Sequence, residues 1–163
     1  MTTIVYKDGV LACDMQCSYG RHCVAINKLV YHPKQEVVRA ISGDLSCGEA
    51  AWESILKKEK IPSNFNGMFG QKQEDNPDFT IVYLYADGSL FVYLEGARKA
   101  YPHSAEYDAW GSGARIALGA LYMGATPAEA VLASCKHDMQ TGIGVMVATP
   151  IPSGFSISSF KLN

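Results

Sequence analysis

Two Asp-Gly pairs, Asp8-Gly9 and Asp87-Gly88, each lie between two runs of apolar and alternating residues. In that setting an Asp-Gly pair is the strongest short-range signal of a β-hairpin, because both residues accept the positive φ of a tight turn. The first pair joins TIVYK (3–7) to VLACD (10–14), and the second joins FTIVYLY (79–85) to SLFVYLEG (89–96). Any fold of this chain must therefore contain antiparallel sheet in two separate places.

A two-residue turn at Asp8-Gly9 also fixes the register of the first hairpin. The predicted pairs are Lys7 with Val10, Tyr6 with Leu11, Val5 with Ala12, Ile4 with Cys13, and Thr3 with Asp14. This register brings the carboxylate of Asp14 beside the first residues of the chain.

Further strands are expected over CVAINKLVY (23–31), EVVRAIS (36–42), Tyr107 to Trp110, GVMVAT (144–149) and FSISSFKL (155–162), the last two joined through PIPSG (150–154). A capping box at Ser46–Glu49 predicts a helix over about 47–58, and TPAE (126–129) predicts another that runs to about Lys136. Between them, GSGARIALGALYMG (111–124) predicts a helix that closes at Gly124. Residues 60–78 are expected to form a long connection.

This order of elements predicts an α+β fold in which two antiparallel sheets are covered on their outer faces by helices. With 163 residues, 48% of them hydrophobic, the chain is expected to form one domain over residues 1–163. A formal net charge of −2 argues against nucleic acid as a partner. No apolar run is long enough for a membrane span and no secretory signal is recognisable, so we expect a cytoplasmic protein and no membrane partner.

The five cysteines, at positions 13, 17, 23, 47 and 135, are odd in number and include no CxxC pair, which favours a reducing compartment over a disulfide framework. Cys17, His22 and Cys23 lie close together in sequence, but the other ligands of a metal site and their usual spacing are absent. We therefore predict no metal at this cluster.

Thr2 would carry both a nucleophilic hydroxyl and a free α-amine once Met1 is removed, and threonine in second position is small enough for that removal. The amine can act as the general base for its own hydroxyl. Many chains begin Met-Thr for no catalytic reason, so this pattern alone leaves both interpretations open.

Lys28 strengthens the catalytic interpretation. In the predicted strand it shares a face with Val24, Ile26 and Val30, so it must either extend to the surface or be buried and paired. Asp14 is the plausible partner, since the hairpin brings it beside Thr2. A buried Lys28 would lower the pKa of the threonine hydroxyl and of the α-amine.

Several segments together resemble the threonine proteases of the proteasome β-subunit family, most closely the bacterial HslV type. They are TTIVYKDGVLACD, NKLVY, AISGDLSCGEA, WGSGARIALGAL and HDMQTGIGV, and they extend over most of the chain. The resemblance implies an N-terminal-nucleophile hydrolase fold, a four-layer αββα sandwich. It departs from the family in the interval from Lys60 to Asp78, which is too short for the usual second helix, and in a slightly shorter loop between Asp14 and Lys28.

Carried over residue by residue, the resemblance implies Thr2 as the nucleophile and Lys28 as the active-site lysine, with Asp14 as its acidic partner. Gly43 matches the glycine whose N–H stabilises the oxyanion. Ser112 matches the serine near the threonine amine, and Asp138 and Thr141 match the residues that support it. Each also has an ordinary structural explanation in a strand end, turn or cap.

The implied activity is that of a threonine endopeptidase, with no metal or organic cofactor required. The implied partners are other copies of the chain in a homo-oligomeric ring or double ring, a peptide or unfolded protein as substrate, and an ATPase unfoldase. Two alternatives remain open at this stage, an inert proteasome-like ring or scaffold protein and a small-molecule amidase.

Overall fold

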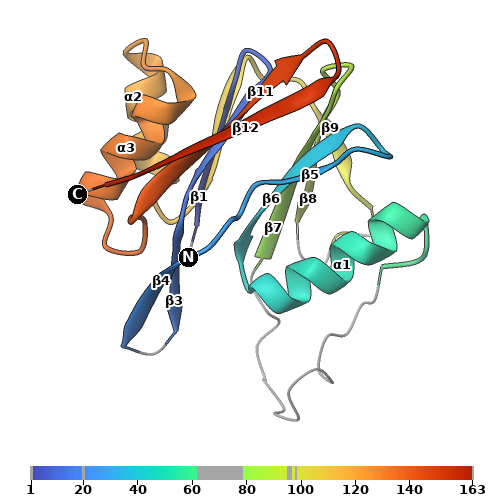
Figure 1. Cartoon of the computed structure of the whole chain (residues 1–163), viewed down its shortest axis with the longest axis horizontal. Coiled ribbons are helices and arrows are strands. Elements are labelled where there is room, and N and C mark those ends of the chain that lie inside the picture. Colours follow the sequence, from blue (N-terminus) through green and yellow to red (C-terminus); the bar gives the residue numbers. More distant parts are fainter. Residues whose placement is uncertain (1, 20, 62–78, 95–96, 98, 163) are drawn as a thin grey trace.

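The computed structural model describes residues 2–19, 21–61, 79–94, 97 and 99–162. The described strands are β1 (Thr3–Lys7), β2 (Val10–Asp14), β3 (Gln16–Tyr19), β4 (His22–Ala25), β5 (Val30–His32), β6 (Val37–Gly43), β7 (Phe79–Tyr85), β8 (Leu90–Leu94), β9 (Tyr101–His103), β10 (Tyr107–Gly111), β11 (Gly144–Ile151) and β12 (Gly154–Lys161). The described helices are α1 (Leu45–Lys57), α2 (Ala114–Tyr122) and α3 (Pro127–His137). The chain thus has the predicted mixed α+β character (Figure 1).

All strand pairing is antiparallel within the described residues, in three sheets. One sheet has the order β10-β1-β2-β11-β12, the second has the order β5-β6-β7-β8-β9, and β3 and β4 pair only with each other. The β1–β2 register confirms the prediction for the four pairs from Ile4–Cys13 to Lys7–Val10. Asp8 and Gly9 have φ values of 51° and 75°, as a hairpin turn with two positive φ values requires.

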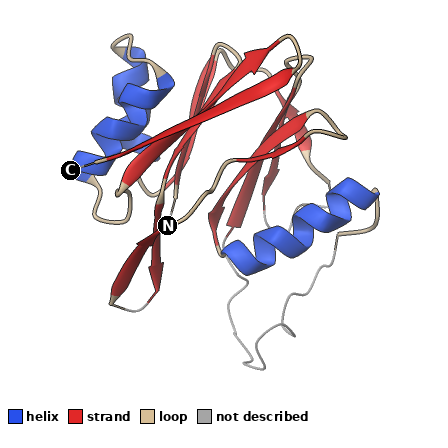
Figure 2. Cartoon of the chain, in the orientation of Figure 1, coloured by secondary structure: helices blue, strands red, loops and turns tan. Residues whose placement is uncertain are grey.

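Three clusters of buried apolar side chains hold these elements together. One lies between the two five-stranded sheets and includes Ile4, Leu11, Val82 and Leu84. A second packs α1 on one sheet around Trp52, and a third packs α2 and α3 on the other around Val131. Figure 2 shows the result: α1 lies on one side of the paired sheets, and α2 and α3 lie on the other.

The strand predicted over residues 23–31 is wrong. It is divided into β4 and β5, with residues 26–29 outside any strand, and Val24 on its predicted buried face is 52% exposed. Lys28 explains the interruption, because its ammonium turns inward to Asp14 and the surrounding backbone leaves the extended course. The hairpin partner of β4 is β3, which we did not predict from the sequence.

The capping box predicted at Ser46–Glu49 is also wrong. Helix α1 begins two residues earlier than predicted, and Asp44 caps it by accepting a hydrogen bond from the Cys47 N–H at 2.9 Å. Glu49 is drawn away from the helix start, because its carboxylate accepts both hydrogen bonds from the Arg39 guanidinium. By contrast, the box at Thr126–Glu129 is confirmed, with Pro127 in the first turn of α3.

Smaller differences complete the comparison with the sequence. The strand β11 is longer than predicted and β12 begins one residue earlier; the two turn at Pro152-Ser153, so PIPSG is not a separate connection. The strand β9 was not predicted. The long connection expected over residues 60–78 falls almost wholly outside the described residues. Among the described helices, none is both long enough and apolar enough to cross a membrane.

Candidate functional site

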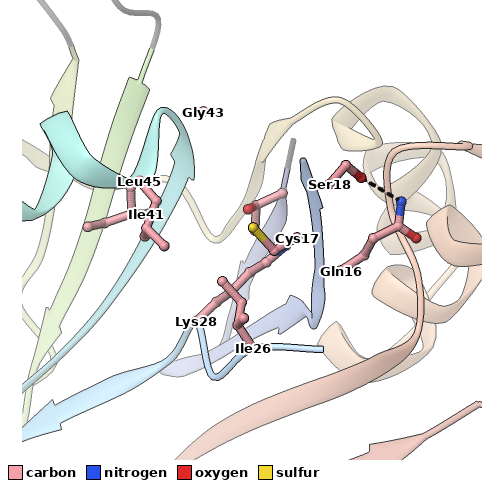
Figure 3. A pocket seen from close by; sticks show the side chains of 9 residues that line it. Gln16, Cys17, Ser18, Ile26, Lys28, Ile41, Gly43 and Leu45 are labelled. Carbon is pink, nitrogen blue, oxygen red and sulfur yellow. Dashed lines mark hydrogen bonds between the residues drawn. The ribbon is translucent and has the colours of Figure 1, made fainter. Parts of the chain in front are cut away.

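A small cavity of about 60 Å³ opens beside the start of β1. It is lined by Thr2, Gln16, Cys17, Ser18, Ile26, Lys28, Ile41, Gly43 and Leu45. In Figure 3, Ile41, Gly43 and Leu45 form one wall, and Gln16, Cys17 and Ser18 form the wall that faces it. Three of the residues singled out from the sequence, namely Thr2, Lys28 and Gly43, therefore meet at one cavity.

Thr2 is held at the cavity through its backbone. Its side chain and main chain are 5% exposed, and its carbonyl oxygen accepts a hydrogen bond of 2.9 Å from the Ser42 hydroxyl. Gly111 lies close to the same carbonyl and to the Ser42 hydroxyl: a Cβ there would lie 1.6 Å from the Thr2 oxygen and 2.7 Å from Ser42 Oγ. Gly111 also has a φ of +96°, so both the space and the backbone conformation require glycine.

Lys28 and Asp14 form a buried ion pair behind the cavity. The Lys28 ammonium lies 3.1 Å from each carboxylate oxygen of Asp14, and the two residues are 3% and 0% exposed. Asp14 also accepts backbone N–H bonds from Thr3 and Gln16, both 2.9 Å, and from Gly142 at 3.2 Å. A buried carboxylate with this many donors is satisfied as an anion and can hold a charged lysine in place.

A second group of side chains consists of hydroxyls and one carboxylate. The Thr141 hydroxyl donates to Asp138 Oδ2 at 2.6 Å and lies 2.6 Å from the Thr3 hydroxyl and 3.4 Å from the Ser112 hydroxyl. Thr3 Oγ1 in turn accepts a bond of 3.0 Å from the Gly113 N–H. Ser112, Asp138 and Thr141 are therefore brought together, as the sequence predicted, and Thr3 joins them.

Asp138 is kept ionised by this group. Burial opposes the charge and raises its pKa, but hydrogen bonds from the Ser112 and Thr141 hydroxyls and the Gln140 N–H outweigh it, so the pKa is lowered from the usual value. The nearby Cys135 thiol has its pKa raised to about 11, first by burial and then by the charge of Asp14, so it is neutral at pH 7. Asp138 therefore presents a carboxylate to two hydroxyl donors.

Gly43 ends β6 at the edge of the cavity, with a φ of +90° that favours glycine over any L-residue. It is paired with Phe79 at the end of β7. Directly after it, Asp44 caps α1, so the backbone around Gly43 passes from a central strand into a capped helix start. Such a position holds main-chain groups rigidly against whatever occupies the cavity.

Sequence reasoning missed four residues that build this site: Thr3, Ser42, Gly111 and Gly113. The two glycines on either side of Ser112 were a usable signal. A Cβ on Gly113 would lie 2.5 Å from the Thr3 hydroxyl and 2.7 Å from Ser134 Cβ, so close approach requires glycine there too. The sequence pattern alone does not distinguish this requirement from an ordinary turn.

The cysteines take different places around the site. Cys17 lines the cavity, Cys23 lies on the exposed face of β4, and Cys13 is wholly buried beside Asp14, where burial and then the Asp14 charge raise the pKa of its thiol. Within the described ranges no three His, Cys, Asp or Glu side chains are grouped so that they could hold a metal ion.

Taken together, the site has a hydroxyl at a cavity, a buried cation, an anchored carboxylate and a neighbouring hydroxyl group. Its residues come from β1, β2, residues 26–29, β6, the turn after β10 and the loop before β11. Compared with known proteins, the chain matches no protein-family model and no curated protein sequence.

Proposed function

We propose that this protein is a threonine-type endopeptidase with an N-terminal nucleophile, related to proteasome β subunits and to HslV-type proteases. The layer order supports it. One apolar cluster joins α1 to one five-stranded sheet, one lies between the two sheets, and one joins α2 and α3 to the other sheet, an arrangement that supports the αββα layers implied by the resemblance. The observation that carries the proposal is that Thr2, Lys28 and Gly43 line one cavity while Lys28 is anchored by the buried Asp14.

In the proposed reaction, removal of Met1 leaves Thr2 with a free α-amine. This amine takes the proton of the Thr2 hydroxyl as its oxygen attacks a peptide carbonyl, and then gives that proton to the leaving amine. The acyl group is left as an ester on Thr2. Water then hydrolyses the ester, which releases the acyl group as a carboxylic acid and restores the Thr2 hydroxyl, so each peptide bond cleaved consumes one water molecule.

Lys28 supplies the positive charge in this scheme. It is the buried cation at the cavity and is held on the Asp14 side by two hydrogen bonds, so its charge favours the deprotonated forms of the Thr2 hydroxyl and amine. The N–H of Gly43 is the donor we assign to the oxyanion. We assign support of the amine to the Ser112, Thr141 and Asp138 group, as the resemblance implies.

The cavity walls suggest the preferred substrate side chain. Ile26, Ile41, Leu45 and Cys17 contribute apolar surface, whereas Gln16 and Ser18 bond to each other at the rim. A small, largely apolar cavity of about 60 Å³ suits a small or branched aliphatic side chain better than a bulky aromatic or a charged one. We therefore expect cleavage after valine, alanine or leucine in preference to phenylalanine or lysine.

A homo-oligomeric ring that encloses the active threonines belongs to the same proposal, with peptides or unfolded proteins as substrates and an ATPase unfoldase as a further partner. Exposed apolar side chains support subunit contacts: Ile157 and Phe160 on β12, and Tyr122 and Met123 at the end of α2. Surface of this kind is commonly covered by a partner. Light scattering of the purified protein measures the number of subunits directly.

The decisive experiment is intact-mass spectrometry of the full-length protein, before and after incubation with an epoxyketone or β-lactone probe that reacts with N-terminal threonine. We expect a mass without Met1 and the addition of one probe per chain. Thr2→Ala should abolish the addition. Thr149→Ala is the matched control, because Thr149 is an exposed threonine of β11 outside the cavity.

Retention of Met1 in protein from its native host would overturn the proposal, since the amine would then lie one residue too far from the hydroxyl. An inert ring or scaffold protein would become the better explanation. Addition of the probe without cleavage of any peptide, together with hydrolysis of small acyl amides, would instead indicate an amidase.

A further inference from the structure

Thr3 has a place in the site that its neighbour Thr2 does not share. Thr2 lines the cavity, whereas Thr3 is the first residue of β1, fully buried, and pairs with Gly111 of β10. Successive residues of a strand point to opposite faces, so the two threonines serve different sides of β1. The Thr3 N–H bonds to Asp14, and the Thr3 hydroxyl bonds to Thr141 and Gly113.

The direction of the hydroxyl bonds around Thr3 is fixed by their two ends. At one end the Gly113 N–H can only donate, and it donates to Thr3 Oγ1. At the other end the Asp138 carboxylate can only accept, and it accepts from Thr141. Each hydroxyl has one proton, so Thr141 must accept from Thr3 at the 2.6 Å contact between them. The chain of donors therefore runs from Gly113 through Thr3 and Thr141 to Asp138.

We propose that Thr3 is a positioning residue of the active site, which ties the Asp14–Lys28 pair to the Ser112–Thr141–Asp138 group and so fixes the backbone that carries Thr2. Its N–H reaches the first group and its hydroxyl reaches the second. The proposed role rests on the proposed function of Thr2 as the nucleophile.

The close packing around Thr3 leaves no room for its hydroxyl to take another position. The Thr3 hydroxyl lies so near Gly113 that a Cβ on this glycine would be 2.5 Å from it. On the same glycine, the Ser134 hydroxyl donates a hydrogen bond to the carbonyl oxygen. Removing the hydroxyl would leave the buried Gly113 N–H without its acceptor and Thr141 without its closest donor. Because hydrogen bonds in a chain strengthen one another, the bond from Thr141 to Asp138 would weaken as well.

The test compares Thr3→Val, which keeps the shape and removes the hydroxyl, with Thr3→Ser, which keeps the hydroxyl and removes the methyl group. With the wild-type protein shown to add an epoxyketone probe, the first-order rate of acylation and the probe's inhibition constant are measured for each variant. We expect Thr3→Val to slow acylation by about tenfold to a hundredfold, with the inhibition constant changed by less than about threefold. Thr3→Ser should restore the rate to within about threefold.

A second readout does not depend on activity. The carboxyl carbon of Asp138 is titrated by NMR in the three proteins, with Asp138→Asn used to assign the signal. The pKa should rise in Thr3→Val and return in Thr3→Ser. A wild-type protein that adds no probe would remove the proposed function and leave this hydrogen-bond chain to be judged on the titration alone.

Three results would overturn the inference. They are an unchanged acylation rate in Thr3→Val, an equal loss in Thr3→Ser, and an Asp138 pKa that does not respond to the loss of the hydroxyl. Should Thr3→Val fail to fold, Thr141→Val interrupts the same chain at its next link and must show the same slow acylation. If Thr141→Val is acylated by the probe as fast as the wild-type protein, the proposed role of Thr3 is contradicted in the same way.

Discussion

The two consecutive hairpins β1–β2 and β3–β4 are built on the same principle but in opposite surroundings. β1 and β2 lie in the middle of a five-stranded sheet, with β10 on one side and β11 on the other, and their central residues are buried. Among the described strands, β3 and β4 pair only with each other, and every residue of β4 is exposed. The first hairpin therefore carries the fixed groups Thr3 and Asp14, and the second supplies one wall of the cavity.

This difference suggests a division of roles. Charges and hydroxyls that must be held within a fraction of an ångström are placed on the hairpin that cannot move without unfolding the sheet. On the proposed function, the wall that a substrate side chain would meet lies on the exposed hairpin, where substitutions are tolerated. Four experiments test how strict the division is.

The largest effect is expected for Asp14→Asn on the buried hairpin. The substitution leaves the Lys28 ammonium, 3% exposed, without its counter-charge. Breaking one side of a buried ion pair should lower the free energy of unfolding by about 3–5 kcal/mol. Urea denaturation of the variant measures this directly, and a loss below about 1 kcal/mol would show that the pair is not held in a dry interior.

The next effect compares truncation in the two hairpins. Leu11→Ala in β2 opens a hole in the cluster between the sheets and should cost about 2–5 kcal/mol. Val24→Ala in β4 removes a side chain that is 52% exposed and should cost less than about 0.5 kcal/mol. The two variants are compared by thermal and urea denaturation. Similar losses of unfolding free energy in both would refute the proposed division of roles between the two hairpins.

A change in the cavity wall should affect selectivity and leave stability almost unchanged. Cys17 on β3 lines the cavity, so Cys17→Leu fills part of its volume. With a series of fluorogenic peptides, we expect the specificity for leucine to fall by about tenfold relative to alanine. Thr149→Leu, at an exposed position of β11 outside the cavity lining, is the matched control and should leave the ratio unchanged.

The smallest expected effect is the dependence of the free energy of unfolding on acidic pH. The pKa of Asp138 is lowered in the folded protein, so its contribution to stability is fully present above its usual pKa of 3.8 and is lost as the pH falls through the lower, folded value. Asp138→Asn should flatten this part of the stability profile. If the free energy of unfolding falls as steeply with acid in Asp138→Asn as in the wild-type protein, other carboxylates are responsible for the pH dependence.

The sequence predicted those parts of the fold whose signals are local and unopposed. The β1–β2 register followed from the Asp8-Gly9 turn, and the start of α3 followed from its capping box. The start of α1 was misplaced because two capping signals overlap, and the choice depends on Arg39, which is far enough away in sequence to be invisible to a local pattern. The β3–β4 hairpin was missed because its exposed strands carry little alternation of apolar residues.

The candidate site was predictable in the same uneven way. The pairing of Lys28 with Asp14 followed from an apolar face and a hairpin register, and the structure has it. The role of Thr3 in the site could not be predicted from the sequence. It depends on contacts with Gly113 and Thr141, which lie more than a hundred residues further along the chain. A threonine at the start of a strand gives no sign of such partners.

The position of β11 has a consequence for the protein during its synthesis. Asp14 on β2 is held partly by the Gly142 N–H, and β2 is flanked by β11, whose paired residues follow more than 130 positions later. On the ribosome, the first hairpin emerges long before these partners exist. On the proposed function, the surroundings of Thr2 are therefore completed only after β11 has been made, so the order of the strands would delay activity until that point of synthesis.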